Sequence, residues 1–119
     1  MTDAEIEALL RRVYVAFNAR DIERVLKAMA PDVDWPNAFE GGRVIGRDAV
    51  REYWQRQFEL ISSKVEPLEF TTLDDGRVQV RVSQEVHDLQ GDLVGQGEVL
   101  HVYRFEDGLV THMEVRAVG

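Results

Sequence analysis

The sequence GEVLHVYRFEDGLVTHMEVRAV, residues 97–118, predicts two long β-strands joined at Glu106-Asp107-Gly108. On both sides of this turn, apolar residues recur mainly at every second position. An Asp-Gly pair between two alternating segments is typical of a β-hairpin. Since successive side chains of a strand point to opposite faces, His101 would lie between Val99 and Tyr103 on one face. The hairpin therefore predicts an imidazole among apolar side chains.

The same alternation assigns the hairpin residues to two faces of the predicted sheet. The inner face would carry Val99, His101, Tyr103, Phe105, Thr111, Met113, Val115 and Ala117. The outer face would carry Leu100, Val102, Arg104, Val110, His112, Glu114 and Arg116. We expect the inner face to cover the core.

The composition is that of one globular domain, residues 1–119. Its 14 basic and 22 acidic residues give a net charge of −8. This balance argues against nucleic acid or anionic lipid as the main partner, because both require a basic surface. We see no stretch of about 18 apolar residues and no signal peptide in MTDAEIEALL, so we expect a cytoplasmic protein without a membrane span. Without cysteine the chain has no disulfide, thiolate nucleophile or cysteine metal site.

Helical periodicity dominates the first half of the chain. Thr2-Asp3-Ala4-Glu5 fits a capping box, and residues 6–17 carry one apolar stripe. Asp21 would cap a second, shorter helix that includes Met29 and ends at Pro31. A third helix would run from Arg47 to about Ile61.

Extended segments fill most of the remainder. We expect them at residues 32–37, 43–45, 64–73 and 78–86, with turns at 41–42 and 74–76. Helices followed by a meander of antiparallel strands indicate an α+β fold. The apolar stripes of the helices would then pack on the apolar face of the sheet.

Four segments of the chain resemble the NTF2-like superfamily, and within it the SnoaL-like and ketosteroid-isomerase-like members. They are YVAFNARD (14–21), MAPDVDW (29–35), GRDAV (46–50) and YRFEDGLV (103–110). The resemblance implies a cone, in which three helices pack in the concave face of a strongly curved, mostly antiparallel sheet and a deep apolar pocket remains at the open end. It also implies a homodimer through the outer sheet face. Because this family hosts enzymes and binding proteins, the pocket residues must indicate the function.

Ketosteroid isomerase, a member of this family, uses an Asp base and an oxyanion hole made of a Tyr and a protonated Asp. In an ungapped comparison the base position falls on Asn37, which cannot abstract a proton. The protonated Asp falls on or beside His101, and the Tyr falls nearest Val13, one residue from Tyr14. We therefore do not expect ketosteroid isomerisation by that route.

The candidate catalytic residues are His101, Asn37, Tyr14 and Tyr103. His101 would act as the acid or base, since an imidazole titrates near neutrality and burial would keep it uncharged. Asn37 with Tyr14 or Tyr103 would polarise a carbonyl group. The alternatives are a core histidine bonded to a backbone or tyrosine oxygen, and a turn asparagine after Pro36.

The candidate ligand-binding residues are the apolar side chains expected on the inner faces of the elements. They are Val13, Phe17, Trp35, Trp54, Phe58, Val80, Val82, Val99, Met113 and Val115. These could form a wall for a flat apolar ligand, or could be plain core. Asp34 should point away from the pocket, and the polar residues at 85, 87, 112 and 114 lack a diagnostic metal spacing. We expect neither a metal nor a cofactor.

These residues lead to two alternative functions. The first is a SnoaL-like, cofactor-independent isomerase, lyase or cyclase that acts by acid–base chemistry on a small apolar molecule with a carbonyl group. The second is a non-catalytic protein of the same fold, either a small-ligand-binding protein or a dimerisation module with a filled cone.

Overall fold

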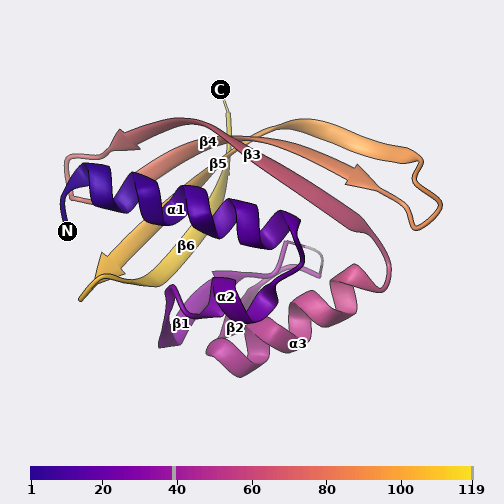
Figure 1. Ribbon diagram of the computed structural model, residues 1–119, viewed down its shortest axis with the longest axis horizontal. Helices are drawn as coiled ribbons and strands as arrows, with labels where there is room; N and C mark the ends of the chain where they lie inside the picture. Colours follow the sequence, from indigo (N-terminus) through magenta and orange to yellow (C-terminus); the bar gives the residue numbers. More distant parts are fainter. Residues whose placement is uncertain (39, 119) are drawn as a thin grey trace.

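The computed structural model describes residues 1–38 and 40–118, which form three helices packed against one six-stranded sheet (Figure 1). The helices are α1 (Asp3–Asn18), α2 (Ile22–Leu26) and α3 (Arg47–Phe58). The strands are β1 (Met29–Pro36), β2 (Arg43–Ile45), β3 (Ser62–Thr72), β4 (Val78–His87), β5 (Leu93–Glu106) and β6 (Leu109–Ala117). The predicted α+β architecture with a mostly antiparallel sheet is confirmed.

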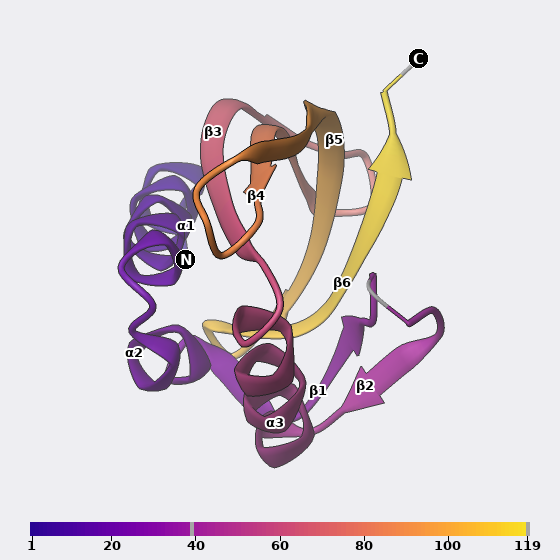
Figure 2. The ribbon, with the colours of Figure 1, turned by 90° about the vertical axis from the view of Figure 1, so that its right-hand side faces the viewer.

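The strand order in the sheet is β2-β1-β6-β5-β4-β3. Only β1 and β6 pair in parallel among the described strands. The sheet is strongly curved, and the three helices lie on its concave side (Figure 2). The core therefore sits between the helices and this concave face, with residues from all three helices and most of the strands.

The start of α1 follows from its capping box. The Thr2 hydroxyl accepts a hydrogen bond from the Glu5 amide at 3.2 Å, and the Thr2 amide donates to Glu5 Oε1 at 2.9 Å. Two backbone amides of the first turn are thereby satisfied, as the sequence predicts. Along the helix Leu10 and Tyr14 are buried and Val15 is exposed, so one face packs on the sheet. No helix within the described residues is both long and apolar enough to cross a membrane.

The second helix is shorter than predicted. Asp21 caps it, but it ends at Leu26, and both Met29 and Pro31 belong to β1. Met29 pairs with Val110 of β6, and the Val110 amide donates to the carbonyl of Ala28 at 2.9 Å. Pairing with the sheet thus replaces the last helical turn that the periodicity indicated. The third helix also ends earlier than predicted, at Phe58.

The hairpin of β5 and β6 forms at the predicted turn. Asp107 and Gly108 both have positive φ, 51° and 79°, as a type I′ turn requires. A bulge follows, because Arg104 pairs with His112 whereas Phe105 pairs with Val110. The placement of Val110 on the outer face was therefore wrong. The residue turns inward, is 2% exposed and joins the core.

Candidate functional site

A cavity of about 120 Å³ lies in the concave side of the fold. Its described lining consists of Val13, Tyr14, Phe17, Val25, Trp35, Pro36, Ala38, Tyr53, Trp54, Gln57, Ser63, Val65, Gln84, His101, Tyr103, Met113 and Val115. None of these side chains is an Asp, Glu, Lys or Arg. For scale, an engineered apolar cavity of roughly 150 Å³ binds benzene. The enclosed space therefore suits about one ring, with further room at the open side.

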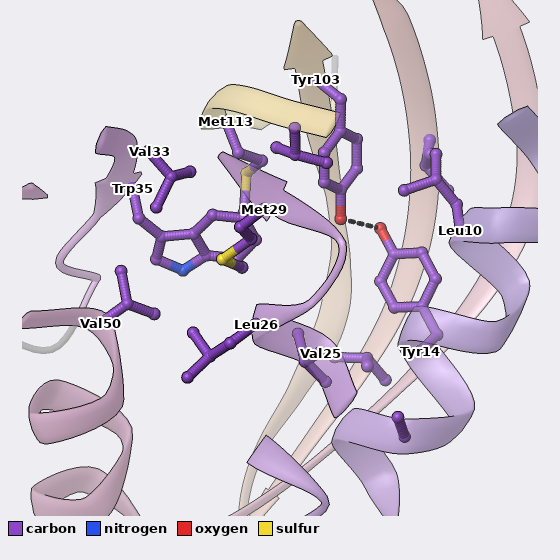
Figure 3. Packing of buried hydrophobic residues seen from close by; sticks show 14 of the residues in the cluster. Leu10, Tyr14, Val25, Leu26, Met29, Val33, Trp35, Val50, Tyr103 and Met113 are labelled. Carbon is purple, nitrogen blue, oxygen red and sulfur yellow. Dashed lines mark hydrogen bonds between the residues drawn. The ribbon is translucent and has the colours of Figure 1, made fainter. Parts of the chain in front are cut away.

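Three polar side chains form a continuous hydrogen-bond chain in this cavity. The hydroxyl oxygen of Tyr14 lies 2.7 Å from that of Tyr103 and 2.9 Å from His101 Nδ1. Figure 3 shows how Tyr14 reaches across from α1 to Tyr103 on β5. The Tyr14 and His101 rings also stack, with centroids 5.9 Å apart.

The secondary structure explains why these side chains meet. His101 and Tyr103 are two residues apart on β5 and so share its inner face. Tyr14 follows Leu10 by four residues on α1, on the stripe that packs against the sheet. On β6, Val115 and Met113 pair with His101 and Tyr103 and extend the apolar floor.

Burial keeps all three groups uncharged at neutral pH. It lowers the pKa of His101 from 6.5 to about 4 and raises the pKa values of Tyr14 and Tyr103. Loss of hydration disfavours the imidazolium and both phenolates. The site therefore works with neutral hydrogen-bond donors and acceptors.

The uncharged hydrogen-bond chain of Tyr103, Tyr14 and His101 has two possible arrangements of its protons. In one, Tyr103 donates to Tyr14 and Tyr14 donates to His101 Nδ1, which leaves an N–H at Nε2. In the other, Nδ1–H donates to Tyr14, Tyr14 donates to Tyr103, and Nε2 carries a free lone pair. Among the described residues Nε2 has no hydrogen-bond partner. The same imidazole can therefore offer either a donor or an acceptor to a ligand.

Aromatic side chains form the wall beside this chain. Trp35 and Trp54 meet edge to face at 5.5 Å, and Phe17 meets Trp54 at 5.6 Å. Trp35 also approaches Tyr103, with ring centroids 6.3 Å apart. Aromatic faces of this kind suit a flat apolar ligand.

The structure gathers most of the sequence-derived candidates around the cavity. Those that line it are His101, Tyr14, Tyr103, Val13, Phe17, Trp35, Trp54, Met113 and Val115. Tyr14 links α1 to both polar residues of β5, at 2.9 Å to His101 and 2.7 Å to Tyr103.

Asn37 is not among the described lining residues. Its side-chain oxygen accepts a hydrogen bond from the Glu40 amide at 2.8 Å, and its backbone bonds to Gly41 and Gly42. This geometry corresponds to the alternative of a turn asparagine. A carbonyl-polarising role would use the side-chain NH2 group of Asn37, and the position of Asn37 outside the described lining does not favour that role.

Phe58, Val80, Val82 and Val99 also lie outside the described lining. Phe58 packs edge to face on Phe17 at 5.5 Å, and the two valines of β4 are fully buried in the core. Strand alternation identifies the inner face correctly for the valines. It does not indicate which part of that face other side chains cover.

Sequence reasoning missed several lining residues, of which Gln57, Ser63 and Gln84 are polar. Gln84 has the same strand parity as Val80 and Val82, so its inward position was visible in the pattern. Ser63 has the same strand parity as Val65, but the predicted strand began at residue 64 and so left it out. The missed apolar residues are Val25, Pro36, Ala38, Tyr53 and Val65.

Asp34 is not among the described lining residues of the cavity. Asp34 pairs with Arg43 at 2.6 Å between β1 and β2. Within residues 1–38 and 40–118, no three His, Cys, Asp or Glu side chains come close enough to hold a metal ion.

Comparisons with known proteins agree with this architecture. Residues 10–113 match the model of the SnoaL-like domain. A crystal structure of TerC co-crystallised with polyporic acid is 31% identical, with a TM-score of 0.80 over 95% of this chain and 90% of that one. A candidate polyketide cyclase from Xanthomonas campestris pv. campestris is 25% identical, with a TM-score of 0.74 over 92% and 87%.

A more distant structure, RV0760c from Mycobacterium tuberculosis in complex with estradiol-17beta-hemisuccinate, is 19% identical, with a TM-score of 0.77 over 91% of this chain and 89% of that one. It supports the fold alone. A comparison with curated protein sequences gave no match. The matched family model spans most of the chain, and the cone of three helices in a curved sheet is shared with these structures, so the chain belongs to the SnoaL-like family of the NTF2-like superfamily.

Proposed function

We propose that this protein binds a small, flat, apolar molecule with a carbonyl group, and acts on it as a cofactor-independent isomerase, lyase or cyclase. The observation that carries this proposal is the imidazole of His101, which bonds to Tyr14 at Nδ1 at 2.9 Å and has no described partner at Nε2. A relative co-crystallised with polyporic acid supports an organic ligand in this fold.

The chemistry uses both ends of the hydrogen-bond chain. With the lone pair at Nε2, His101 accepts a proton from the carbon next to the ligand carbonyl. In this arrangement the Tyr103 hydroxyl is free to donate to the oxygen that becomes an enolate. The imidazolium then returns its proton to another carbon or to a leaving group. Protonation of another carbon gives isomerisation, and protonation of a leaving group gives elimination. In ring closure the enolate carbon instead attacks a second carbonyl carbon of the ligand, and the imidazolium protonates the oxygen of the opened C=O bond.

A pKa of about 4 does not make His101 too weak a base. The aspartate base of ketosteroid isomerase has a pKa of roughly 4.6 and succeeds because hydrogen bonds stabilise the enolate. Here the base would come from β5 rather than from the β1 turn, where Asn37 stands. The proposal therefore assigns the base to a different wall of the cone.

The alternative is a binding protein without turnover. It is favoured by the uncharged lining, which suits ligand burial as well as catalysis. A dimerisation module with a filled cone is less well supported, because a cavity of about 120 Å³ remains beside the aromatic wall.

Deuterium exchange separates catalysis from binding. The probe is 2-tetralone in D2O, with exchange at its α-carbons followed by NMR and binding followed by the fluorescence of Trp35 and Trp54. We expect wild-type protein to bind the ketone and accelerate exchange. His101→Gln should retain affinity within about threefold and lose at least about a hundredfold in exchange rate, the low end for acid–base catalysis.

The matched control is His112→Gln, on the outer face of β6, which should leave both values unchanged. Binding without accelerated exchange would support the non-catalytic alternative. Equal exchange by wild type and His101→Gln would refute the role of His101.

We also propose a homodimer through the outer sheet face. Leu100 is half-buried there, and the surrounding surface carries ion pairs such as Arg81–Glu98 at 3.1 Å and Arg77–Glu114 at 3.0 Å. Such a mixed surface is typical of a partly polar interface. Light scattering at high micromolar concentration should give twice the monomer mass of 13.6 kDa, and a monomer mass would contradict the proposal.

A further inference from the structure

Ser63 is a buried polar residue whose side chain makes no hydrogen bond to the described part of the protein. It is 2% exposed and lines the cavity, and its hydroxyl bonds to no described residue. Its neighbours differ in this respect, since Ser62 accepts from Arg20 at 2.8 Å and Asn18 binds both backbone groups of Val65. Arg81 Nε is the one side-chain polar atom of the described residues that is both buried and without a partner, so Ser63 Oγ is not sealed inside the protein but reaches the cavity, where its hydroxyl is available to a ligand.

The register of the sheet places Ser63 far from His101. Ser63 pairs with Val86 of β4, whereas His101 pairs with Val80 of the same strand. Six residues correspond to about 20 Å along a straight strand. The curvature of the sheet brings both residues to one cavity, so they mark its two ends.

Gln84 lies between these ends, and the sheet is open beside it. Gln84 pairs with Gly97, and the next inward residue, Val86, pairs with Gly95. A Cβ added to either glycine would meet nothing within 4 Å. A groove of about 260 Å³ that Gln84 shares with the cavity continues over these glycines. The end of the cavity that carries Ser63 and Gln84 therefore has room for the far part of a ligand.

We propose that Ser63 and Gln84 form a second polar site, which binds a neutral hydrogen-bonding group at the end of the ligand remote from His101. This inference rests on the proposed function, since it requires a ligand in the cavity. The group is a hydroxyl or carbonyl rather than a carboxylate or ammonium, because no residue lining the cavity carries a charge and the one charged residue of the groove, Glu98, is already paired with Arg81 at 3.1 Å. The ligand is then an elongated, flat, uncharged molecule with a polar group at each end.

Two matched ketones test the second site. The probes are 4-acetylbiphenyl and 4-acetyl-4′-hydroxybiphenyl, which differ only in the hydroxyl at the far end. Isothermal titration should show that wild-type protein binds the hydroxylated ketone about threefold to tenfold more tightly, the range for one added hydrogen bond. Ser63→Ala should abolish this preference and leave the affinity for 4-acetylbiphenyl unchanged.

Ser83→Ala is the matched control. Ser83 is next to Gln84 on β4 and therefore points to the other face of the sheet, so this variant should keep the preference for the hydroxylated ketone. A third probe with a carboxylate in place of the far hydroxyl should bind at least about tenfold more weakly than 4-acetylbiphenyl. Ser63→Ala should not lower the melting temperature, since its hydroxyl holds no described part of the protein. A marked decrease would identify a structural partner and overturn the inference.

The outcomes separate this inference from the proposed function. Equal binding of the two neutral ketones by wild type, or a preference that persists in Ser63→Ala, would overturn the second site but leave ligand binding near His101 intact. Failure of both ketones to bind would overturn the proposed function and the second site with it.

Discussion

Acid should destabilise the protein through His101 before most carboxylates titrate. The native pKa of this imidazole is about 4, against 6.5 in the unfolded chain. Between these values the unfolded state binds a proton that the native state does not, so stability rises with pH across this window. The stabilisation from neutral His101 is therefore complete above pH 6.5 and is lost as the pH falls towards 4.

The magnitude follows from the difference of about 2.5 pH units between the two pKa values. At about 1.4 kcal/mol per unit, the complete loss is about 3 kcal/mol. The cleanest interval is pH 6.5 to 5, because most Asp and Glu side chains remain ionised there. Over that interval the expected loss is about 2 kcal/mol.

Urea denaturation of wild type and His101→Gln at pH 7, 6 and 5 measures this effect. The variant keeps a polar group of similar reach but cannot titrate, so the difference between the two proteins isolates the imidazole. An NMR titration of the three histidines provides an independent value, with His101 expected to remain neutral at pH 5. Parallel pH dependence of the two proteins, or protonation of His101 near 6.5, would refute the burial of this imidazole.

Two further predictions concern the walls of the cavity. Tyr14→Phe removes the middle of the hydrogen-bond chain and both its bonds, so it should lower the free energy of unfolding by about 2–3 kcal/mol, whereas Tyr103→Phe removes one bond and should cost about 1 kcal/mol. Equal losses in urea denaturation would contradict the central position of Tyr14. Trp54→Ala should cost about 3–5 kcal/mol, because Trp54 is 3% exposed and its loss leaves a cavity. Asn37→Ala removes one exposed hydrogen bond of the turn and should cost only about 1 kcal/mol. Calorimetry should therefore give a much lower melting temperature for Trp54→Ala than for Asn37→Ala, and similar values would contradict both predictions.

The inward direction of His101 and Tyr103 could be predicted because it depends only on the alternation of a regular strand. Val110 could not, since the bulge between Arg104 and Phe105 shifts the register by one residue. A bulge changes which residues oppose each other without changing the pattern of apolar residues. Sequence alternation is therefore reliable up to the first irregularity in pairing.

The contact between Tyr14 and His101 shows a second limit of prediction from the sequence. The helical stripe predicts that Tyr14 is buried, but its partner lies 87 residues away along the chain. Only the packing of α1 on the curved sheet selects that partner. The ungapped comparison with ketosteroid isomerase pointed to Val13, which lines the cavity but has no polar side chain. The hydrogen bonds come from the next residue, Tyr14, which is rotated by about 100° around the helix.

The uncharged lining explains why a histidine can replace a carboxylate in such a cavity. A carboxylate in this uncharged lining would have no cation to hold it ionised, so burial would raise its pKa. An imidazole is already neutral; here Nδ1 bonds to Tyr14, while Nε2 bonds to no described residue and is available to a ligand. Reversal of the hydrogen-bond chain then changes His101 from donor to acceptor without bringing any net charge into the apolar site. The cavity therefore keeps the charges of this acidic protein outside its lining, as the proposed proton transfer on a neutral ligand requires.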